Sequence, residues 1–154
     1  MKLPEFDDCL KRKKIVYSSV AKKLAAKELK VAKDDFLISQ RSLKQKMYKW
    51  TTVQAYYAMF HAARSLLYHK GYREKNHYCL ILAMKAFYVA EGILEMRLVE
   101  SLQAAKTLRE GADYDNIFDS KSAKALVNQA EEFVKVAGEV VSAAKAMRRG
   151  EWSQ

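Results

Sequence analysis

The sequence predicts an all-α protein, an antiparallel bundle of about five to six helices. Apolar residues recur at three- and four-residue steps along most of the chain, as on the buried face of a helix. No stretch shows sustained period-two alternation over β-branched residues, so strands are not expected. No linker, internal repeat or low-complexity segment marks a boundary within the 154 residues. Residues 1–154 are therefore expected to form a single domain.

The first two expected helices differ in length. Pro4 can occupy a first-turn position, with acids near the positive end of a short helix and Lys11 to Lys14 near its negative end. A long amphipathic helix then runs to about Leu43, and a tight turn follows near Lys46. Its apolar positions are Val20, Leu24, Ala25, Leu29, Val31, Ala32 and Phe36.

A third helix, from about Lys49 to His69, is expected to be central. Small side chains at Ala55, Ala58 and Ala62 permit close approach by another helix. Gly71 is expected to end this helix. The apolar stripe that faces the core consists of Tyr56, Met59, Phe60, Ala63, Leu66 and Leu67.

The remaining chain predicts three more helices. Asn76 can cap a fourth helix over Tyr78 to Tyr88, and a fifth runs from about Leu94 to Glu110. Asp119 or Ser120 caps the last helix, whose apolar residues keep a helical spacing. Antiparallel packing of these segments gives the predicted bundle.

The net charge of +10 is concentrated in the first third of the chain. Such a field attracts polyanions and acidic proteins. Lysines spread along helices also commonly form a solvated face. Charge therefore leaves open nucleic-acid contact, contact with an acidic partner, and a plain solvated surface.

The two cysteines, Cys9 and Cys79, have neither the density of a secreted scaffold nor the close spacing of a zinc or redox motif. Both are expected to be reduced and partly buried. The N-terminal sequence MKLPEFDDC places acids where a secretion signal needs an apolar run, and Tyr78 to Ala90 is too short to span a membrane. We expect a soluble, cytoplasmic protein without membrane contact.

A search for catalytic motifs in the sequence is mostly negative. It contains no glycine-rich phosphate loop, no paired histidines at metal spacing and no nucleophile placed beside a histidine and an acid. We therefore expect no metal site and no cofactor. A polar and aromatic stripe remains on the third helix, within a sector of roughly 60° at 100° per residue. Its members are Trp50, Tyr57, His61, Arg64 and Tyr68.

The run AYYAMFHAARSLLYHKGYREKNH, from Ala55 to His77, resembles the central helix and following turn of small prokaryotic HEPN-domain proteins. The segments LREGADYD, from Leu108 to Asp115, and SAKALVNQAEEFV, from Ser122 to Val134, are similar to later helices of the same subgroup. The resemblance spans about Val31 to Ala137. It implies a helical bundle, usually dimeric, found in RNA cleavage, toxin–antitoxin pairs and nucleotide-linked defence. Many such proteins work beside a minimal nucleotidyltransferase.

Active members of the family carry an arginine followed, after four to six residues, by a histidine, and cleave RNA without metal. The cation stabilises charge on the phosphorane, while the imidazole moves protons to or from the ribose hydroxyls. Arg64 and His69 match this spacing, but in a straight helix they project about 140° apart. They converge only if the helix unwinds toward Gly71 or if two protomers share one site. The structural alternative is that Arg64 pairs with a buried carboxylate and His69 caps the helix end.

In related subgroups the same motif lies on a later helix, where this sequence has Arg109 to Tyr114. Asp113 and Tyr114 occupy the places where the histidine and a tyrosine are expected. An aspartate accepts hydrogen bonds only and repels phosphate, which argues against nuclease activity. Arg109 and Asp113 also have the spacing of an ordinary helix salt bridge.

The combined prediction is a HEPN-domain homodimer that pairs with a minimal nucleotidyltransferase in a toxin–antitoxin or stress-defence pair and handles RNA or nucleotide. A non-catalytic nucleotide- or RNA-binding module and a dimeric scaffold for an acidic partner remain as alternatives. Arg64, His69 and Arg109 are the catalytic candidates for metal-independent RNA cleavage. The candidate RNA- or nucleotide-binding residues are Tyr57, His61, Tyr68, Arg73, His77, Asp113 and Tyr114.

Overall fold

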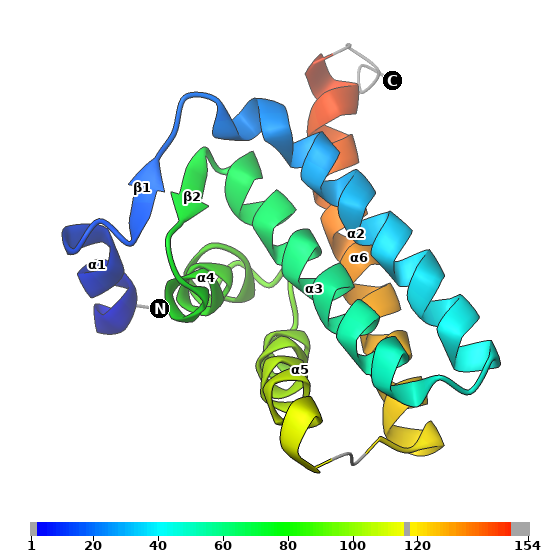
Figure 1. Ribbon diagram of the computed structural model, residues 1–154. Helices are drawn as coiled ribbons and strands as arrows, with labels where there is room; N and C mark the ends of the chain where they lie inside the picture. The colour runs from blue at the N-terminus through cyan, green and yellow to red at the C-terminus, as the bar shows by residue number, and fades with distance from the viewer. Residues whose placement is uncertain (1–2, 116–117, 149–154) are drawn as a thin grey trace.

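The computed structural model describes residues 3–115 and 118–148, with the backbone alone for 111–115 and 144–148. Within these residues the chain forms a helical bundle with one small two-stranded sheet (Figure 1). The elements are α1 (Pro4–Lys11), β1 (Ile15–Tyr17), α2 (Ala21–Lys44), α3 (Tyr48–His69), β2 (Tyr72–Glu74), α4 (His77–Met84), the π-helical turn η1 (Lys85–Val89), α5 (Met96–Asp115) and α6 (Ser120–Arg148). The all-α prediction is confirmed.

Helix α3 occupies the centre, with α2 and α6 along its length and α4 and α5 on another side (Figure 1). The small residues Ala55, Ala58 and Ala62 are fully buried, so neighbouring helices approach the α3 backbone closely. The bulky core residues Met59 and Leu66 are likewise fully buried. The prediction of a central helix is confirmed.

Helices α2 and α3 form an antiparallel hairpin around a tight turn. Lys46 has a φ of 61°, the left-handed backbone of a turn residue, as the sequence predicts for this position. Buried polar side chains join the two helices beside the turn. The Ser42 hydroxyl lies 2.9 Å from the Thr51 hydroxyl and donates to the Gln54 side-chain oxygen at 2.8 Å. Because these groups satisfy one another, their burial costs little free energy.

The prediction that the chain has no strands is wrong. Strands β1 and β2 pair antiparallel, with Ile15 opposite Glu74 and Tyr17 opposite Tyr72. Three residues per strand are too few to show an alternating pattern, so the sequence gives no local signal for this ladder. Gly71 ends α3 with a φ of 89°, a conformation that favours glycine, and leads directly into β2.

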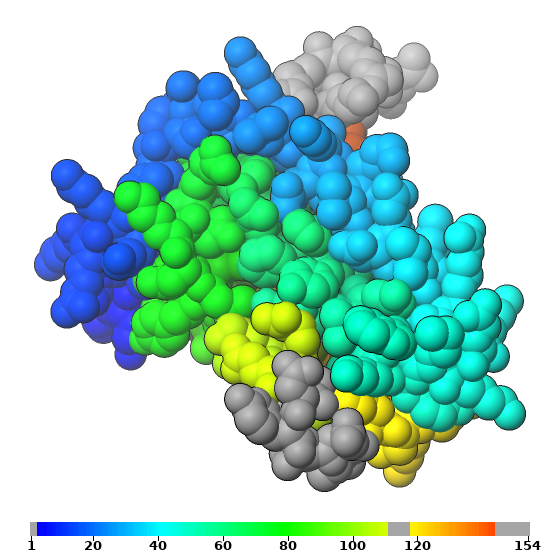
Figure 2. All heavy atoms as spheres, viewed as in Figure 1, coloured from blue at the N-terminus to red at the C-terminus, as the bar shows by residue number. Residues whose placement is uncertain are grey.

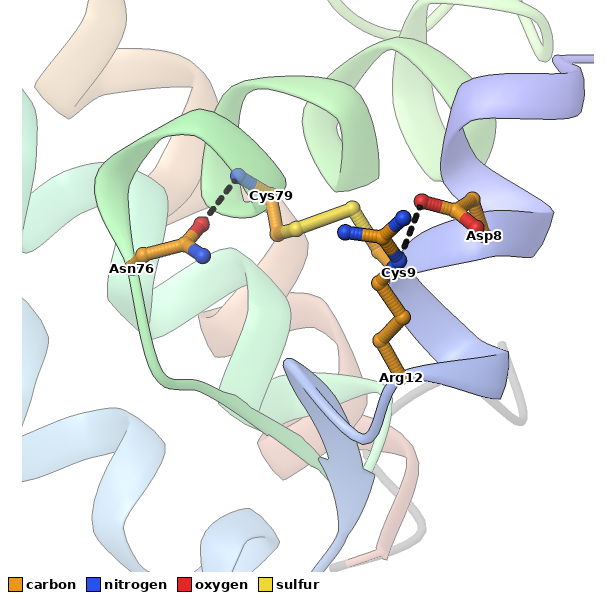
Figure 3. The surroundings of a disulfide bond; sticks show 5 residues. All are labelled: Asp8, Cys9, Arg12, Asn76 and Cys79. Atoms are coloured by element: carbon orange, nitrogen blue, oxygen red, sulfur yellow. Dashed lines mark hydrogen bonds and ion pairs between the residues drawn. A yellow bond between two sulfur atoms is a disulfide. The ribbon is translucent and has the colours of Figure 1, made fainter.

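The prediction that both cysteines are reduced is also wrong, because Cys9 of α1 and Cys79 of α4 form a disulfide (Figure 3). The two residues are 70 positions apart, so their spacing in the sequence does not reveal the bond. Helix packing brings their Cα atoms to 5.9 Å, within the range of a disulfide. Beside it the Asn76 side chain accepts a hydrogen bond from the Cys79 N–H at 2.8 Å, which confirms the predicted cap (Figure 3).

The later helices follow the expected order with shifted boundaries. Helix α4 continues into η1, where the buried Tyr88 hydroxyl donates to the Leu66 carbonyl oxygen at 2.6 Å. The Asp119 carboxylate accepts a hydrogen bond from the Ser122 N–H at 2.7 Å and caps α6. No helix in the described part of the chain has the length and apolar character to cross a membrane.

Candidate functional site

The centre of the candidate site is a carboxylate on α2 that contacts two bases on α3. Glu28 Oε1 lies 2.5 Å from His61 Nδ1 and 3.3 Å from Arg64 Nη1. His61 and Arg64 are three positions apart, which places both side chains on one face of α3. Helices α2 and α3 pack along their length, so this face meets Glu28. All three side chains are largely buried.

A second carboxylate holds Arg64 from the opposite side. Glu74 lies on β2, and its Oε2 is 3.1 Å from Arg64 Nε. The Arg64 guanidinium also donates a hydrogen bond to the Tyr68 hydroxyl and lies over the Tyr68 ring. Two carboxylates therefore surround one guanidinium, and the small sheet that carries Glu74 completes this arrangement. This is the pairing that the structural alternative for Arg64 describes.

The electrostatics of the cluster keep Arg64 charged. Burial disfavours the charged form of Arg64, but the carboxylates of Glu74 and Glu28 outweigh it and raise the pKa of Arg64 above its usual value. Burial also works to raise the pKa of Glu28, yet the hydrogen bond with His61 and the charge of Arg64 lower it overall. For Glu74 burial prevails, and its pKa is raised. The positive charge of Arg64 is thus balanced locally.

His61 connects this cluster to its aromatic neighbours. Its Nε2 lies 3.9 Å from a carboxylate oxygen of Asp35, so the ring stands between two acids of α2. The ring also stacks on Tyr57, with centroids 6.2 Å apart. Burial raises the pKa of Asp35 above its usual value. His61 therefore has a hydrogen-bond partner at Nδ1, a more distant acid near Nε2 and a stacked ring on one face.

Arg109 on α5 reaches the same face of α3. Its Nη1 donates to the Tyr57 hydroxyl at 3.2 Å, and its guanidinium lies over the rings of Tyr56 and Tyr57 at 5.3 and 5.4 Å. Such contacts between a cation and aromatic faces stabilise by about 0.5–2 kcal/mol. Among the side chains that the structure describes, two carboxylates form ion pairs with Arg64 and none does so with Arg109, while the buried Nε of both arginines lacks a hydrogen bond. Arg109 thus differs from Arg64 in its surroundings.

His77, at the start of α4, packs on the apolar side of this region. Its ring stacks on Tyr56 and Phe60, with centroids 6.1 Å apart in both pairs. Burial, together with the charge of Lys106, lowers the pKa of His77 to about 4. Burial likewise raises the pKa of Tyr56 to about 12. Both rings are therefore neutral near pH 7.

These contacts form one continuous row of polar and aromatic side chains, which we call the polar seam. It begins at Arg109, follows α3 and ends at β2, where the Arg73 guanidinium lies 5.4 Å from the centre of the Tyr68 ring. Figure 2 shows α3, in teal to green, reaching the surface between α2, in blue to cyan, and the end of α5, in yellow. The polar seam consists of Arg109, Tyr57, His61, Glu28, Arg64, Glu74, Tyr68 and Arg73.

Every member of the polar seam lies inside the part of the chain that matches a known family. The family model of the HEPN domain matches residues 25–145. The chain belongs to the HEPN domain family. A protein of Methanocaldococcus jannaschii named "Putative toxin MJ0605" is 28% identical over 107 residues, which cover 69% of this chain and 80% of that protein.

The structure of this HEPN domain does not bring the predicted pair of Arg64 and His69 together within one chain. Helix α3 is continuous through His69, so the unwinding toward Gly71 that would align them is not present in the described chain. In a regular helix, five positions separate the two side chains by about 140°. His69 is half-buried at the last position of α3. Within this chain the imidazole that shares a carboxylate with Arg64 is that of His61.

The predicted residues on α5 are only partly described. Arg109 lies in the polar seam as stated above, whereas Asp113 and Tyr114 belong to the backbone-only segment of α5, so their predicted roles fall outside the described side chains. Trp50 lies at the start of α3, about two helical turns from Tyr57. It is exposed and lines a groove with Ile38 and Met47, apart from the contacts that make up the polar seam.

Three carboxylates of the candidate site, Glu28, Asp35 and Glu74, were missed from the sequence. Glu28 and Asp35 lie seven positions apart in a lysine-rich helix, a spacing that places them on one face of α2. That spacing is the sequence signal by which Glu28 and Asp35 could have been found. No sequence signal indicates Glu74, because its position depends on the ladder between β1 and β2.

Proposed function

We propose that this HEPN domain protein is one component of a toxin–antitoxin pair and binds RNA or a nucleotide along the polar seam. Membership of the family and the relative named as a toxin support the pairing. In this proposal the chain is a cytoplasmic homodimer, and its partner is a minimal nucleotidyltransferase. In this proposal the chain binds RNA or a nucleotide, and a single chain does not cleave RNA.

The observation that carries the binding proposal is the placement of Arg109 over Tyr56 and Tyr57. Single-stranded nucleic acids are held by cations that contact phosphate and by aromatic rings on which bases stack. Arg109 supplies the cation, and Tyr57, stacked with His61, supplies a half-exposed ring beside it. In this proposal the Arg109 guanidinium, which lies over both tyrosine rings and donates to the Tyr57 hydroxyl, is the cation that contacts a phosphate.

Arg64 supports binding without cleavage. A catalytic arginine must stabilise negative charge on the reacting phosphate. In this chain Glu28 and Glu74 already contact the Arg64 guanidinium, so a phosphate at that place would meet two like charges. Asp113 also stands where active subgroups carry their histidine on the later helix. Cleavage by the isolated chain is therefore disfavoured.

Fluorescence anisotropy with a labelled 12-nucleotide RNA and with ATP tests this function. We expect binding at low salt that weakens at least about tenfold in Arg109→Ala. Arg97→Ala is the matched control, because Arg97 is already paired with Glu95 and Glu132 on the exposed surface of α5 and α6. Absence of binding to either ligand, or equal loss in both variants, would contradict the proposal.

A second candidate function, metal-independent RNA cleavage, is favoured by one observation. Glu28 fixes His61 through Nδ1, next to the guanidinium of Arg64, so a base and a cation lie on adjacent turns of α3. A second protomer would have to displace the carboxylates from Arg64. In chelator, RNA fragments that disappear in Arg64→Ala, and in either His61→Ala or His69→Ala, would establish this activity. Intact RNA at high protein concentration excludes it.

If the protein is cytoplasmic, as proposed, the Cys9–Cys79 disulfide must persist in that compartment. Disulfides are rare in reducing cytoplasm but are common in intracellular proteins of hyperthermophilic organisms. Both sulfur-bearing residues are buried, which protects the bond from thiols in solution. Alkylation of free thiols during lysis, followed by mass measurement, shows whether the bond exists in cells.

A further inference from the structure

The tip of the α2–α3 hairpin carries a cluster of exposed apolar side chains. Leu37, Ile38, Met47 and Trp50 are each between 43% and 51% exposed. Ile38, Met47 and Trp50 line one groove of about 400 Å³ between the two helices. We call these four residues the tip patch. In Figure 2 it belongs to the region at the lower right, where the cyan end of α2 meets the teal start of α3.

The sequence around the tip patch is mostly basic, and its nearest acids on α2 are Asp34, already paired with Lys30, and Asp35. Residues 36–50 contain Arg41, Lys44, Lys46 and Lys49 and no acid, and Arg41 also lines the groove. The Lys49 ammonium lies 5.6 Å from the centre of the Trp50 ring. An apolar centre inside a charged rim is typical of a protein–protein interface, and Trp, Met and Arg are enriched in such interfaces.

The apolar residues indicate the class of partner. Leu37, Ile38 and Met47 are aliphatic, so they offer neither a ring for a base to stack on nor a hydrogen bond to its edge. They gain free energy by contact with other apolar side chains. A second copy docking through the same patch would bring two basic faces together, and this repulsion between like charges costs free energy. Trp50 offers one ring on which a base can stack, but the three aliphatic side chains favour an apolar protein surface over RNA, and the shared positive charge disfavours a symmetric self-contact.

We infer that the tip patch binds a partner protein through an acidic amphipathic helix. A row of large apolar side chains on that helix fills the groove beside Ile38, Met47 and Trp50. Aspartates and glutamates along its flanks pair with Arg41, Lys49 and their neighbours. The complementary charges steer the encounter and fix the orientation of the helix. This inference rests on the proposed function only in requiring that a partner protein exists.

The tip patch and the Arg109 end of the polar seam are separable by mutation. Trp50 and Tyr57 are about two helical turns apart on α3, and Arg109 contacts Tyr57 rather than the tip. A variant at Ile38 therefore tests the partner surface, and one at Arg109 tests RNA binding. Loss of one activity leaves the other measurable, so failures of the two proposals are distinguishable.

The test uses a synthetic 18-residue helix with leucines on one face and glutamates on both flanks, and a matched helix with lysines in place of the glutamates. Trp50 emission reports binding in a Trp152→Phe background, because the chain has two tryptophans. We expect a saturable blue shift with the glutamate helix, at least about tenfold tighter than with the lysine helix. Ile38→Asp should weaken that binding at least about tenfold with an unchanged Tm.

The matched control is Ile93→Asp, which alters an aliphatic side chain of similar exposure, 46% against 43% for Ile38, beside the acidic residues Glu95 and Glu132. It should leave binding of the glutamate helix unchanged. Equal binding of both helices, or equal effects of both variants, would overturn the inference. A shift of Trp50 emission with the 12-nucleotide RNA or with anionic vesicles that depends on Ile38 would also overturn it. So would a dimer of this chain, seen by sedimentation, that is lost in Ile38→Asp.

Discussion

Glu28 on α2 lies 2.5 Å from His61 on α3, measured from Oε1 to Nδ1, and the same oxygen contacts Arg64 at 3.3 Å. One side chain thus connects two helices and two of the basic residues of the polar seam, His61 and Arg64. The geometry fixes the imidazole and offsets the charge of the guanidinium. Removing the carboxylate tests both effects.

Glu28→Gln should lower the free energy of unfolding by about 1–3 kcal/mol, because it leaves Arg64 with one carboxylate and weakens the hydrogen bond to His61. Chemical denaturation measures the change. Asp34→Asn on the same helix is the control, since Asp34 forms an exposed pair with Lys30 that contributes at most about 0.5 kcal/mol. Equal stability of the two variants would show that the contacts of Glu28 do not stabilise the fold.

His77 should make the protein less stable as the pH falls from 6.5 toward 4. Its pKa is lowered from 6.5 to about 4 in the folded chain, so the unfolded chain binds a proton first in this window. The contribution of neutral His77 to the free energy of unfolding is therefore fully present above pH 6.5 and is lost as the pH falls through about 4. In His77→Phe, which keeps a ring against Tyr56 and Phe60, the fall in Tm between pH 6.5 and 4.5 should be smaller than in the wild type. Parallel pH profiles of Tm would contradict the burial of a neutral imidazole.

The helices of this fold could be predicted because their signals are local. The alanine series of α3, the tight turn near Lys46, the end of α3 at Gly71 and the Asn76 cap each follow from nearby sequence. The disulfide and the β-ladder depend on residues far apart in the chain, joined by packing that periodicity does not encode. The residues of the candidate site likewise include some that local sequence predicts and others that only the packing reveals. His61, Arg64 and Arg109 were predicted as candidates, whereas the carboxylates that contact His61 and Arg64 were found only in the structure.

The Cys9–Cys79 bond should stabilise the chain by constraining its unfolded state. It spans 70 positions, a loop for which the chain-entropy description gives about 4 kcal/mol, the upper end of the typical range of about 2–4 kcal/mol. The double variant Cys9→Ser, Cys79→Ser should lose that amount in chemical denaturation without reductant. Reductant should destabilise the wild type and leave the double variant unchanged. Equal sensitivity of the two proteins to reductant would exclude a stabilising bond.

Tyr88→Phe should cost about 1–2 kcal/mol, because it removes the hydrogen bond from a buried hydroxyl to the Leu66 carbonyl oxygen. The apolar ring remains, so packing against α3 changes little. Tyr17→Phe, at a tyrosine that is mostly exposed, should change the free energy of unfolding by less than about 0.5 kcal/mol. Thermal and chemical denaturation of both variants measure the difference, and equal effects would show that the hydrogen bond does not contribute.

The most direct test of RNA binding along the polar seam is the salt dependence of that binding. Anisotropy with the 12-nucleotide RNA should give a linear plot of log affinity against log salt, because each phosphate contact releases counterions. Arg109→Ala should reduce the slope by about 0.7, the change for one phosphate contact on a single strand, whereas Arg97→Ala should leave it unchanged. A slope identical in the wild type and in Arg109→Ala would contradict the account.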